Sequence, residues 1–145
     1  PTQDTYQIAE LRRRLGFEFN GMRLHEYYFE SLGGDGMANV NSNLYTALQT
    51  QYGSFDIWLN EFKAAGMMRG IGWVILYYDP EAKMFHNVWI TDHEVGHLAG
   101  LPIILAMDVW EHAYLPDYLP SQRKDYIEAF FNNLNWQSVE ARLEK

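Results

Sequence analysis

The residues best suited to chemistry stand where an apolar run ends in the C-terminal half of the chain. Asp108 and His112 are four residues apart, just after the run 102–107. If a buried strand there passes into a turn or helix, both side chains can converge on one point. A carboxylate and an imidazole suit iron or manganese. The pair therefore predicts a metal site, although an Asp–His ion pair at the surface is the commoner reason for such a spacing.

A second group of histidines forms a short motif. Residues 93–97 read His-Glu-Val-Gly-His, which matches the HExxH pattern of zinc peptidases. In those enzymes two histidines one helical turn apart bind zinc, and the glutamate is a general base for water. The pattern needs a helix, whereas this motif follows a predicted strand and is soon followed by Pro102. The zinc peptidase is therefore a remote alternative.

The composition limits the partners of the protein. The chain has 145 residues, of which 48% are hydrophobic and 16% aromatic, enough for one domain with a real core. A formal charge of -8 argues against a nucleic-acid partner, whose phosphates need a basic surface. Every apolar run is shorter than the ~18–20 residues of a membrane span. The absence of cysteine excludes thiolate metal sites. We expect no nucleic acid, no membrane and, by default, a cytoplasmic location.

Hydrophobic spacing predicts the elements that must position these residues. Apolar residues at helical spacing predict helices over 4–15, 24–32, 44–52, 55–62 and 127–134, and a last one from Trp136. Runs of strand-forming residues predict strands over 73–78, 83–91 and 102–107. A turn at 79–82 makes the first two strands a hairpin. The order is helices, a three-stranded antiparallel sheet, then helices, which is an α+β fold.

Residues 102–114, Pro-Ile-Ile-Leu-Ala-Met-Asp-Val-Trp-Glu-His-Ala-Tyr, resemble the signature of the iron/manganese superoxide dismutases. Upstream, Leu-His-Glu-Tyr-Tyr-Phe-Glu at 24–30 is similar to the family's helix with the pattern Asn-His-x-x-Phe-Trp, departing from it at Leu24 and Phe29. Further likeness lies in the segments 54–65, 70–73, 123–127 and 133–136. The resemblance covers the chain from about Phe17 to its end. It implies the family's α+β fold and the disproportionation of superoxide to dioxygen and hydrogen peroxide.

The resemblance also implies a ligand set. His25, Asp108 and His112 match metal ligands of the family, with one ion per chain. Residues 92–102 follow an iron-type branch with the pattern Asn-His-x-x-x-His-x-Ala-x-x-Pro, in which a histidine replaces the glutamine beside the metal-bound solvent. His93 is then that histidine and His97 is structural. This pattern favours iron over manganese.

The remaining site residues follow from the same resemblance. Trp73 and Trp110 wall the site with apolar rings, although ordinary core packing would also explain them. Glu111 reaches the ligand histidine of the partner subunit, which implies a homodimer or a higher homo-oligomer. Arg123 is the candidate for local positive charge toward the superoxide anion, or else a structural arginine at a helix start. Gly21 stands about where many iron enzymes place their glutamine.

One part of the family pattern has no counterpart in residues 1–20. Family members begin with a helix that carries the first histidine ligand, and no histidine precedes His25 here. We therefore expect a fold without that first ligand-bearing helix. Residues 1–38 would be a remnant of the helical N-terminal domain and residues 39–145 the α+β C-terminal domain. A truncated, inactive or weakly metal-binding domain is then the alternative to a working superoxide dismutase.

Overall fold

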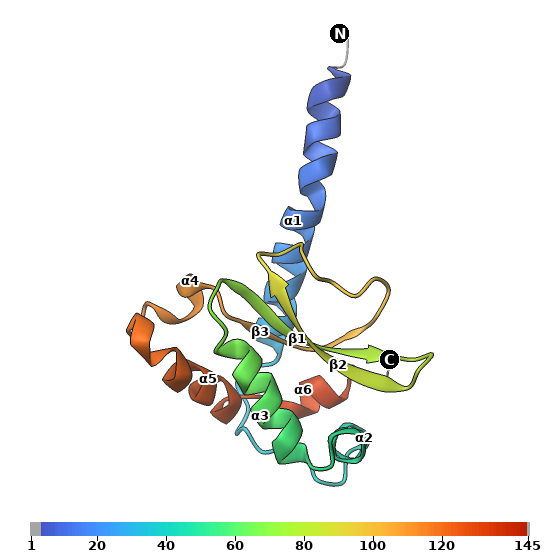
Figure 1. The fold of residues 1–145 in the computed structure, drawn as a ribbon, viewed down its shortest axis with the longest axis vertical. Helices are drawn as coiled ribbons and strands as arrows, with labels where there is room; N and C mark the ends of the chain where they lie inside the picture. Colours follow the sequence, from blue (N-terminus) through green and yellow to red (C-terminus); the bar gives the residue numbers. More distant parts are fainter. Residues whose placement is uncertain (1–3, 145) are drawn as a thin grey trace.

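The computed structural model describes residues 4–144, and Figure 1 shows their course. The helices are α1 (Thr5–Glu30), α2 (Asn43–Tyr52), α3 (Phe55–Gly66), α4 (Glu111–Tyr114), α5 (Arg123–Asn132) and α6 (Trp136–Glu140), with a 3₁₀ turn η1 (Pro120–Gln122). The strands are β1 (Gly72–Asp79), β2 (Met84–Thr91) and β3 (Ile103–Asp108). The predicted α+β fold with a three-stranded sheet is confirmed.

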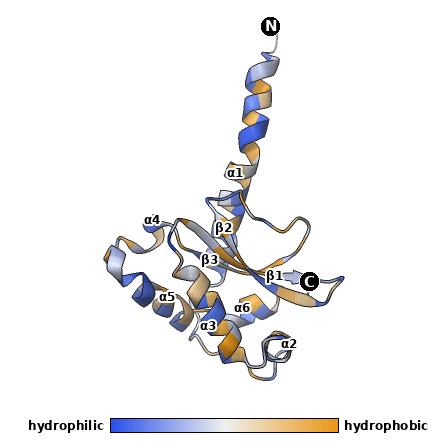
Figure 2. Ribbon diagram, in the orientation of Figure 1, coloured by the Kyte–Doolittle hydropathy of each residue, from blue (hydrophilic) through white to orange (hydrophobic). Residues whose placement is uncertain are grey.

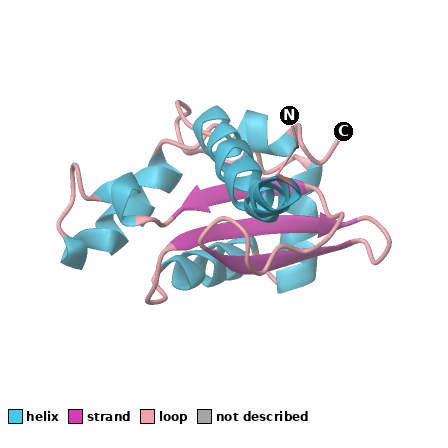
Figure 3. Cartoon of the chain, turned by 90° about the horizontal axis from the view of Figure 1, so that it is seen from above, coloured by secondary structure: helices cyan, strands magenta, loops and turns pink. Residues whose placement is uncertain are grey.

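The sheet is antiparallel throughout, with the strand order β2-β1-β3. Its central strand β1 is buried from Trp73 to Tyr77, which explains why these residues are all apolar or aromatic rather than alternating. Helices lie on both sides of the three strands, as Figure 3 shows from above. The register pairs Trp73 with Asp108, so a tryptophan of β1 stands beside the last residue of β3.

The N-terminal region differs from the sequence-based expectation. Two helices were expected over 4–15 and 24–32, but α1 is one continuous helix of 26 residues. No proline separates the two apolar stripes, and a single glycine such as Gly16 costs a helix only about 1 kcal/mol. The two stripes are therefore two faces of one helix. Asp4 caps it, because its side chain accepts hydrogen bonds from the main-chain N–H groups of Tyr6 and Gln7.

Only the C-terminal half of α1 is packed on the body of the molecule. Leu24 and Tyr28 are buried in the common core, whereas Leu11 and Leu15 are 73% and 60% exposed. Figure 1 shows the N-terminal half of α1 standing away from the sheet, and Figure 2 shows hydrophilic and hydrophobic residues alternating along it. The half that touches the sheet carries His25.

The end of α1 is tied to the sheet by a buried arginine. Arg142, only 8% exposed, donates to the carbonyl oxygens of Tyr27 (3.0 Å) and Ile104 (3.1 Å) and to the Ser31 hydroxyl (2.9 Å). Burial lowers the pKa of Arg142, while its hydrogen bond to Glu30 opposes that shift. Because Tyr27 lies on α1 and Ile104 on β3, this guanidinium fixes the two elements against each other. Within residues 4–144, no helix is long and apolar enough to cross a membrane.

Candidate metal centre

Three segments bring the candidate ligands together at one end of the sheet. Asp108 is the last residue of β3, His112 lies in α4, and His25 projects from the packed half of α1. The Asp108 Oδ1 atom accepts a hydrogen bond from the main-chain N–H of Trp110 at 2.9 Å. This short turn reverses the direction of the chain, so that His112 faces back onto the carboxylate.

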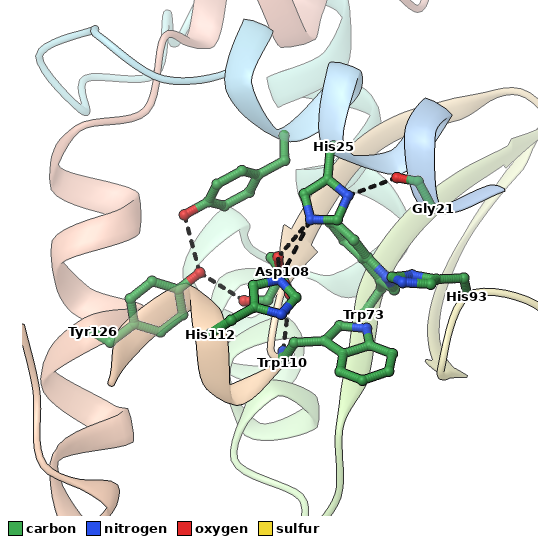
Figure 4. Close-up of polar contacts among 9 residues, drawn as sticks. Gly21, His25, Trp73, His93, Asp108, Trp110, His112 and Tyr126 are labelled. Atoms are coloured by element: carbon green, nitrogen blue, oxygen red, sulfur yellow. Dashed lines mark hydrogen bonds and ion pairs between the residues drawn. The ribbon is translucent and has the colours of Figure 1, made fainter. Parts of the chain in front are cut away.

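The ligand atoms of these three residues form a tight triangle (Figure 4). Asp108 Oδ2 lies 3.1 Å from His112 Nε2 and 3.4 Å from His25 Nε2, and the two Nε2 atoms are 3.4 Å apart. With ligand bonds of about 2.0–2.1 Å to an ion, as for nitrogen on zinc, ligands at 90° to 120° would lie about 2.8–3.6 Å apart. All three measured distances fall in that range. The triangle therefore fits one metal ion.

The tautomer of His25 is set by a main-chain carbonyl. His25 Nδ1 lies 2.6 Å from the Gly21 oxygen, which can only accept, so Nδ1 carries the proton. The Nε2 atom then keeps a lone pair that faces the other two ligand atoms of the triangle. Metal-binding histidines usually donate their second ring N–H to a carbonyl or carboxylate in this way. The tautomer of His25 thus suits a metal ligand.

The carboxylate of Asp108 lies in an apolar setting. The residue is 1% exposed, and burial raises the pKa of Asp108, although the Trp110 N–H and the two histidines oppose the shift. A buried carboxylate is costly unless a positive charge balances it. Tyr126 donates to the main-chain oxygen of Asp108 at 2.6 Å, and the Tyr28 hydroxyl, 3.2 Å from that of Tyr126, donates to it in turn. The buried carboxylate therefore favours a cation beside it, and the two tyrosines fix the main chain that carries it.

His93 borders the triangle and has a defined tautomer. The indole N–H of Trp73 donates to His93 Nδ1 at 2.9 Å, so in the neutral ring Nε2 carries the proton. The Trp110 ring stacks on His93 with centroids 4.8 Å apart, and Phe17 of α1 meets it edge-on at 4.8 Å. Burial, and then the nearby histidines His25 and His112, lower the pKa of His93. The ring is thus held as a neutral hydrogen-bond donor next to the ligands.

Comparisons with known proteins agree on one family. Residues 40–142 match the model of the C-terminal domain of iron/manganese superoxide dismutases. The chain belongs to the iron/manganese superoxide dismutase family.

Three relatives show how far the match extends. The chain is 36% identical to superoxide dismutase [Fe] of Sulfolobus acidocaldarius, over 99% of this chain and 69% of that protein. It is 37% identical to superoxide dismutase [Fe] of Saccharolobus solfataricus, over 97% of this chain and 67% of the relative. Superoxide dismutase [Mn] of Haloarcula marismortui is 39% identical, over 86% and 61% of the two chains. The chain spans about two thirds of the length of these superoxide dismutases.

The HExxH segment does not have the geometry of a zinc peptidase. Residues 92–98 form a turn and a single β-bridge between Thr91 and Val95, not a helix. His97 lies away from the ligand triangle, with its Nε2 atom 2.9 Å from the His93 oxygen. The two histidines therefore do not form a pair of ligands on one helical face. The segment is a loop that places His93 beside the ligand triangle.

The structure also locates Glu111 and Arg123. Glu111 is exposed at the start of α4, next to His112. Arg123 begins α5 and donates to the Gly70 oxygen at 2.8 Å, with its guanidinium 5.9 Å from the centre of the Tyr114 ring. Its contacts are those of the structural arginine that the sequence left as an alternative. A role in attracting superoxide stays a prediction.

Two features of the site were not predicted from the sequence. Tyr126 supports Asp108 from a helix 18 residues away, and nothing in its local pattern predicts that contact. Gly21 is packed against His93, where a Cβ atom would lie only 3.1 Å from the imidazole Cδ2. For Gly21 the sequence carries one signal, because it stands one helical turn before His25. A helix predicted over residues 16–24 would have placed Gly21 and His25 on the same face.

Proposed function

We propose that this protein is a superoxide dismutase in which His25, Asp108 and His112 hold one iron or manganese ion. The observation that supports this most is the triangle of ligand atoms, with edges of 3.1 to 3.4 Å, beside a histidine fixed as a donor. The names of the relatives point to the same reaction. A bound iron or manganese ion would supply one-electron redox chemistry, by which one superoxide would be oxidised to dioxygen and a second reduced, with two protons, to hydrogen peroxide.

The side chains of this protein set the conditions for that chemistry. The Asp108 carboxylate contributes a negative charge that favours the higher charge state of a metal. Trp73 and Trp110 line the site with rings and limit the entry of bulk water. His93, with its Nε2–H beside the ligands, donates a hydrogen bond to an oxygen atom in the site, which is the role that we assign to it.

We infer iron rather than manganese as the preferred ion. Two imidazoles and one carboxylate are a donor set typical of non-haem iron, whereas manganese favours sites dominated by oxygen. The relatives include superoxide dismutases named for iron and others named for manganese, so the preference rests on the donor set alone. Reconstitution of the metal-free protein with each ion, followed by a superoxide assay, tests the preference. Higher activity per bound manganese than per bound iron would reverse it.

We also propose that the protein forms a homodimer through α4. His112 Nε2 faces the triangle, and among residues 4–144 no hydrogen-bond partner of its Nδ1 atom is found. Glu111 is exposed on the same short helix, so Glu111 of the partner subunit can accept that N–H across a twofold axis. Light scattering should give twice the chain mass at micromolar concentration. Glu111→Ala should weaken the dimer, and a wild-type monomer under these conditions would refute the proposal.

The test of the main proposal combines metal analysis with activity. The purified chain should carry about one iron or manganese per chain and accelerate superoxide loss in a stopped-flow assay. His25→Ala and Asp108→Asn should lose metal, while His86→Ala, a half-buried histidine on β2 away from the site, should not. A chain with a full metal complement and no activity above free metal would overturn the assignment.

A further inference from the structure

His97 belongs to the HExxH motif, yet it lies outside the ligand triangle and has two defined contacts. Its Nδ1 atom is 2.6 Å from the Tyr77 hydroxyl, and its Nε2 atom is 2.9 Å from the main-chain oxygen of His93. A carbonyl oxygen can only accept, so Nε2 must carry the proton and Nδ1 is the acceptor. The Tyr77 hydroxyl therefore donates to His97, and His97 donates to His93.

Tyr77 is well suited to act as the donor in this chain. The residue is 1% exposed, and burial raises the pKa of Tyr77 to about 12, with a main-chain hydrogen bond to Leu98 acting in the opposite direction. The hydroxyl thus keeps its proton over the whole physiological range. A permanent donor on one side of His97 fixes its tautomer, and the fixed tautomer keeps the bond to His93.

The spacing of the motif matches the spacing of two anchors on β1. Trp73 and Tyr77 are four residues apart in the strand, so their side chains lie on the same face of the sheet. Trp73 donates to the ring of His93, and Tyr77 donates to the ring of His97, which is four residues further along the chain. The loop is therefore fastened to β1 at two points.

The loop needs this second point because its tip is otherwise lightly held. Asp92 adopts a left-handed φ of 55°, and the bridge between Thr91 and Val95 closes a turn with His93 at its tip. Glu94 and Val95 are exposed. Apart from the bond from His97, His93 is held through its ring, by the Trp73 indole N–H and by ring contacts with Phe17, Trp110 and His25. Among residues 4–144, the bond from His97 is the only hydrogen bond made to the main chain of His93.

We propose that His97, held by Tyr77, is a positioning residue that fixes the main chain of His93 and with it the direction of the His93 Nε2–H. The proposal rests on the role assigned to His93 in the proposed function. It gives the second histidine of the motif a purpose that involves no metal: His97 aims the donor that the site uses.

The test reads the imidazole of His93 directly in the 145-residue chain. Long-range ¹H–¹⁵N spectra of the metal-free protein at pH 8 report which ring nitrogen carries the proton. In the wild type, His93 and His97 should both show the Nε2–H tautomer. In His97→Leu the His93 signals should shift and broaden as the ring samples several positions. Tyr77→Phe, which touches His93 only through His97, should change them in the same direction.

Two further variants separate positioning from packing. His97→Gln keeps an N–H donor near the place of Nε2 and should restore much of the wild-type His93 spectrum. His86→Leu, opposite Tyr77 in the β1–β2 register, should leave it unchanged. In the metal-loaded protein, His97→Leu should lower the rate of superoxide loss about 10-fold, as loss of an outer hydrogen-bond partner commonly does.

The outcomes distinguish this inference from the proposed function. Wild-type His93 signals in both Tyr77→Phe and His97→Leu would overturn the positioning role, whatever the activity. If His97→Leu does not fold, Tyr77→Phe alone decides, because phenylalanine fills the same space. Loss of the His93 geometry without any effect on superoxide consumption would instead remove His93 from the mechanism while leaving the anchor in place.

Discussion

Gly21→Ala should separate the stability of α1 from the geometry of the metal site. A Cβ at position 21 would lie 3.1 Å from His93 Cδ2 and 3.3 Å from Nε2, so the imidazole must move by a few tenths of an ångström. Alanine stabilises a helix interior by about 1 kcal/mol relative to glycine. The forced shift of His93 costs roughly 0.5–1.5 kcal/mol, as for a strained side chain. The free energy of unfolding should therefore change by less than about 1 kcal/mol, because the two contributions oppose each other.

The function of the site should suffer more than its stability. The Trp73–His93 hydrogen bond is 2.9 Å long. A shift of the imidazole by a few tenths of an ångström would lengthen it toward the ~3.2 Å at which such bonds weaken. We expect superoxide consumption by the metal-loaded variant to fall about 3- to 10-fold, since small misplacements of a reacting group are costly.

Gly16→Ala is the matched control, because it lies in the same helix and its Cβ would meet nothing within 4 Å. It should raise the melting temperature by about 2–4 °C, as 1 kcal/mol does in a protein of this size, with unchanged activity. Denaturation and stopped-flow assays on both variants give the comparison. If Gly21→Ala matched Gly16→Ala in both stability and activity, the close packing of Gly21 on His93 would be refuted.

Three further predictions concern stability. Arg142→Met should lower the free energy of unfolding by about 3 kcal/mol in urea denaturation, since it removes charged hydrogen bonds to buried groups. Arg13→Met, which breaks an exposed pair with Glu10, is the control and should leave the urea midpoint unchanged. Burial raises the pKa of Tyr77 to about 12, above its ordinary value of about 10, so the folded state favours the neutral phenol. The resulting stabilisation is complete below pH ~10 and is lost as the pH rises toward ~12. The free energy of unfolding of the wild type should therefore fall more steeply over that pH interval than that of Tyr77→Phe. Equal pH dependence in the two proteins would contradict the raised pKa of Tyr77. Gly72→Ala should prevent folding or cost several kcal/mol by thermal melting, because its φ is 138° and its Cβ would lie 1.9 Å from the Ile90 oxygen.

The order and type of most elements could be predicted because each carried a local signal. Ser54 caps α3, and Gly53 ends α2 with a positive φ of 88°; serine and glycine are the residue types typical of these two positions. The hairpin of β1 and β2 followed from two strand-forming runs on either side of a turn. The continuity of α1 could not be predicted in the same way. Its two apolar stripes point in different directions, and only the packing of Leu24 and Tyr28 on the sheet shows which of them is buried.

The candidate ligands were named from a resemblance, and the spacing of Asp108 and His112 alone left a surface ion pair open. The hydrogen-bond partners that set the tautomer of each imidazole could not be predicted from the sequence. The proton on His25 is located by a carbonyl of its own helix, and that on His93 by an indole of β1. These assignments depend on distances between segments that are far apart in the chain.

The positions of His25 and Asp108 relative to each other depend on a residue at the other end of the chain. Arg142 binds the carbonyl of Tyr27, two residues after His25, and that of Ile104, four residues before Asp108. A change in the geometry of the Arg142 guanidinium would therefore alter the 3.4 Å distance between His25 Nε2 and Asp108 Oδ2. Arg142→Lys retains the charge but cannot bridge both carbonyls with a planar fork. We expect this variant to remain folded and to bind iron about 10-fold more weakly, a loss in the range seen when groups that orient metal ligands are removed. Isothermal titration of the metal-free protein with Fe²⁺ measures the effect, and wild-type affinity in a destabilised Arg142→Lys protein would show that the arginine supports the fold without setting the site.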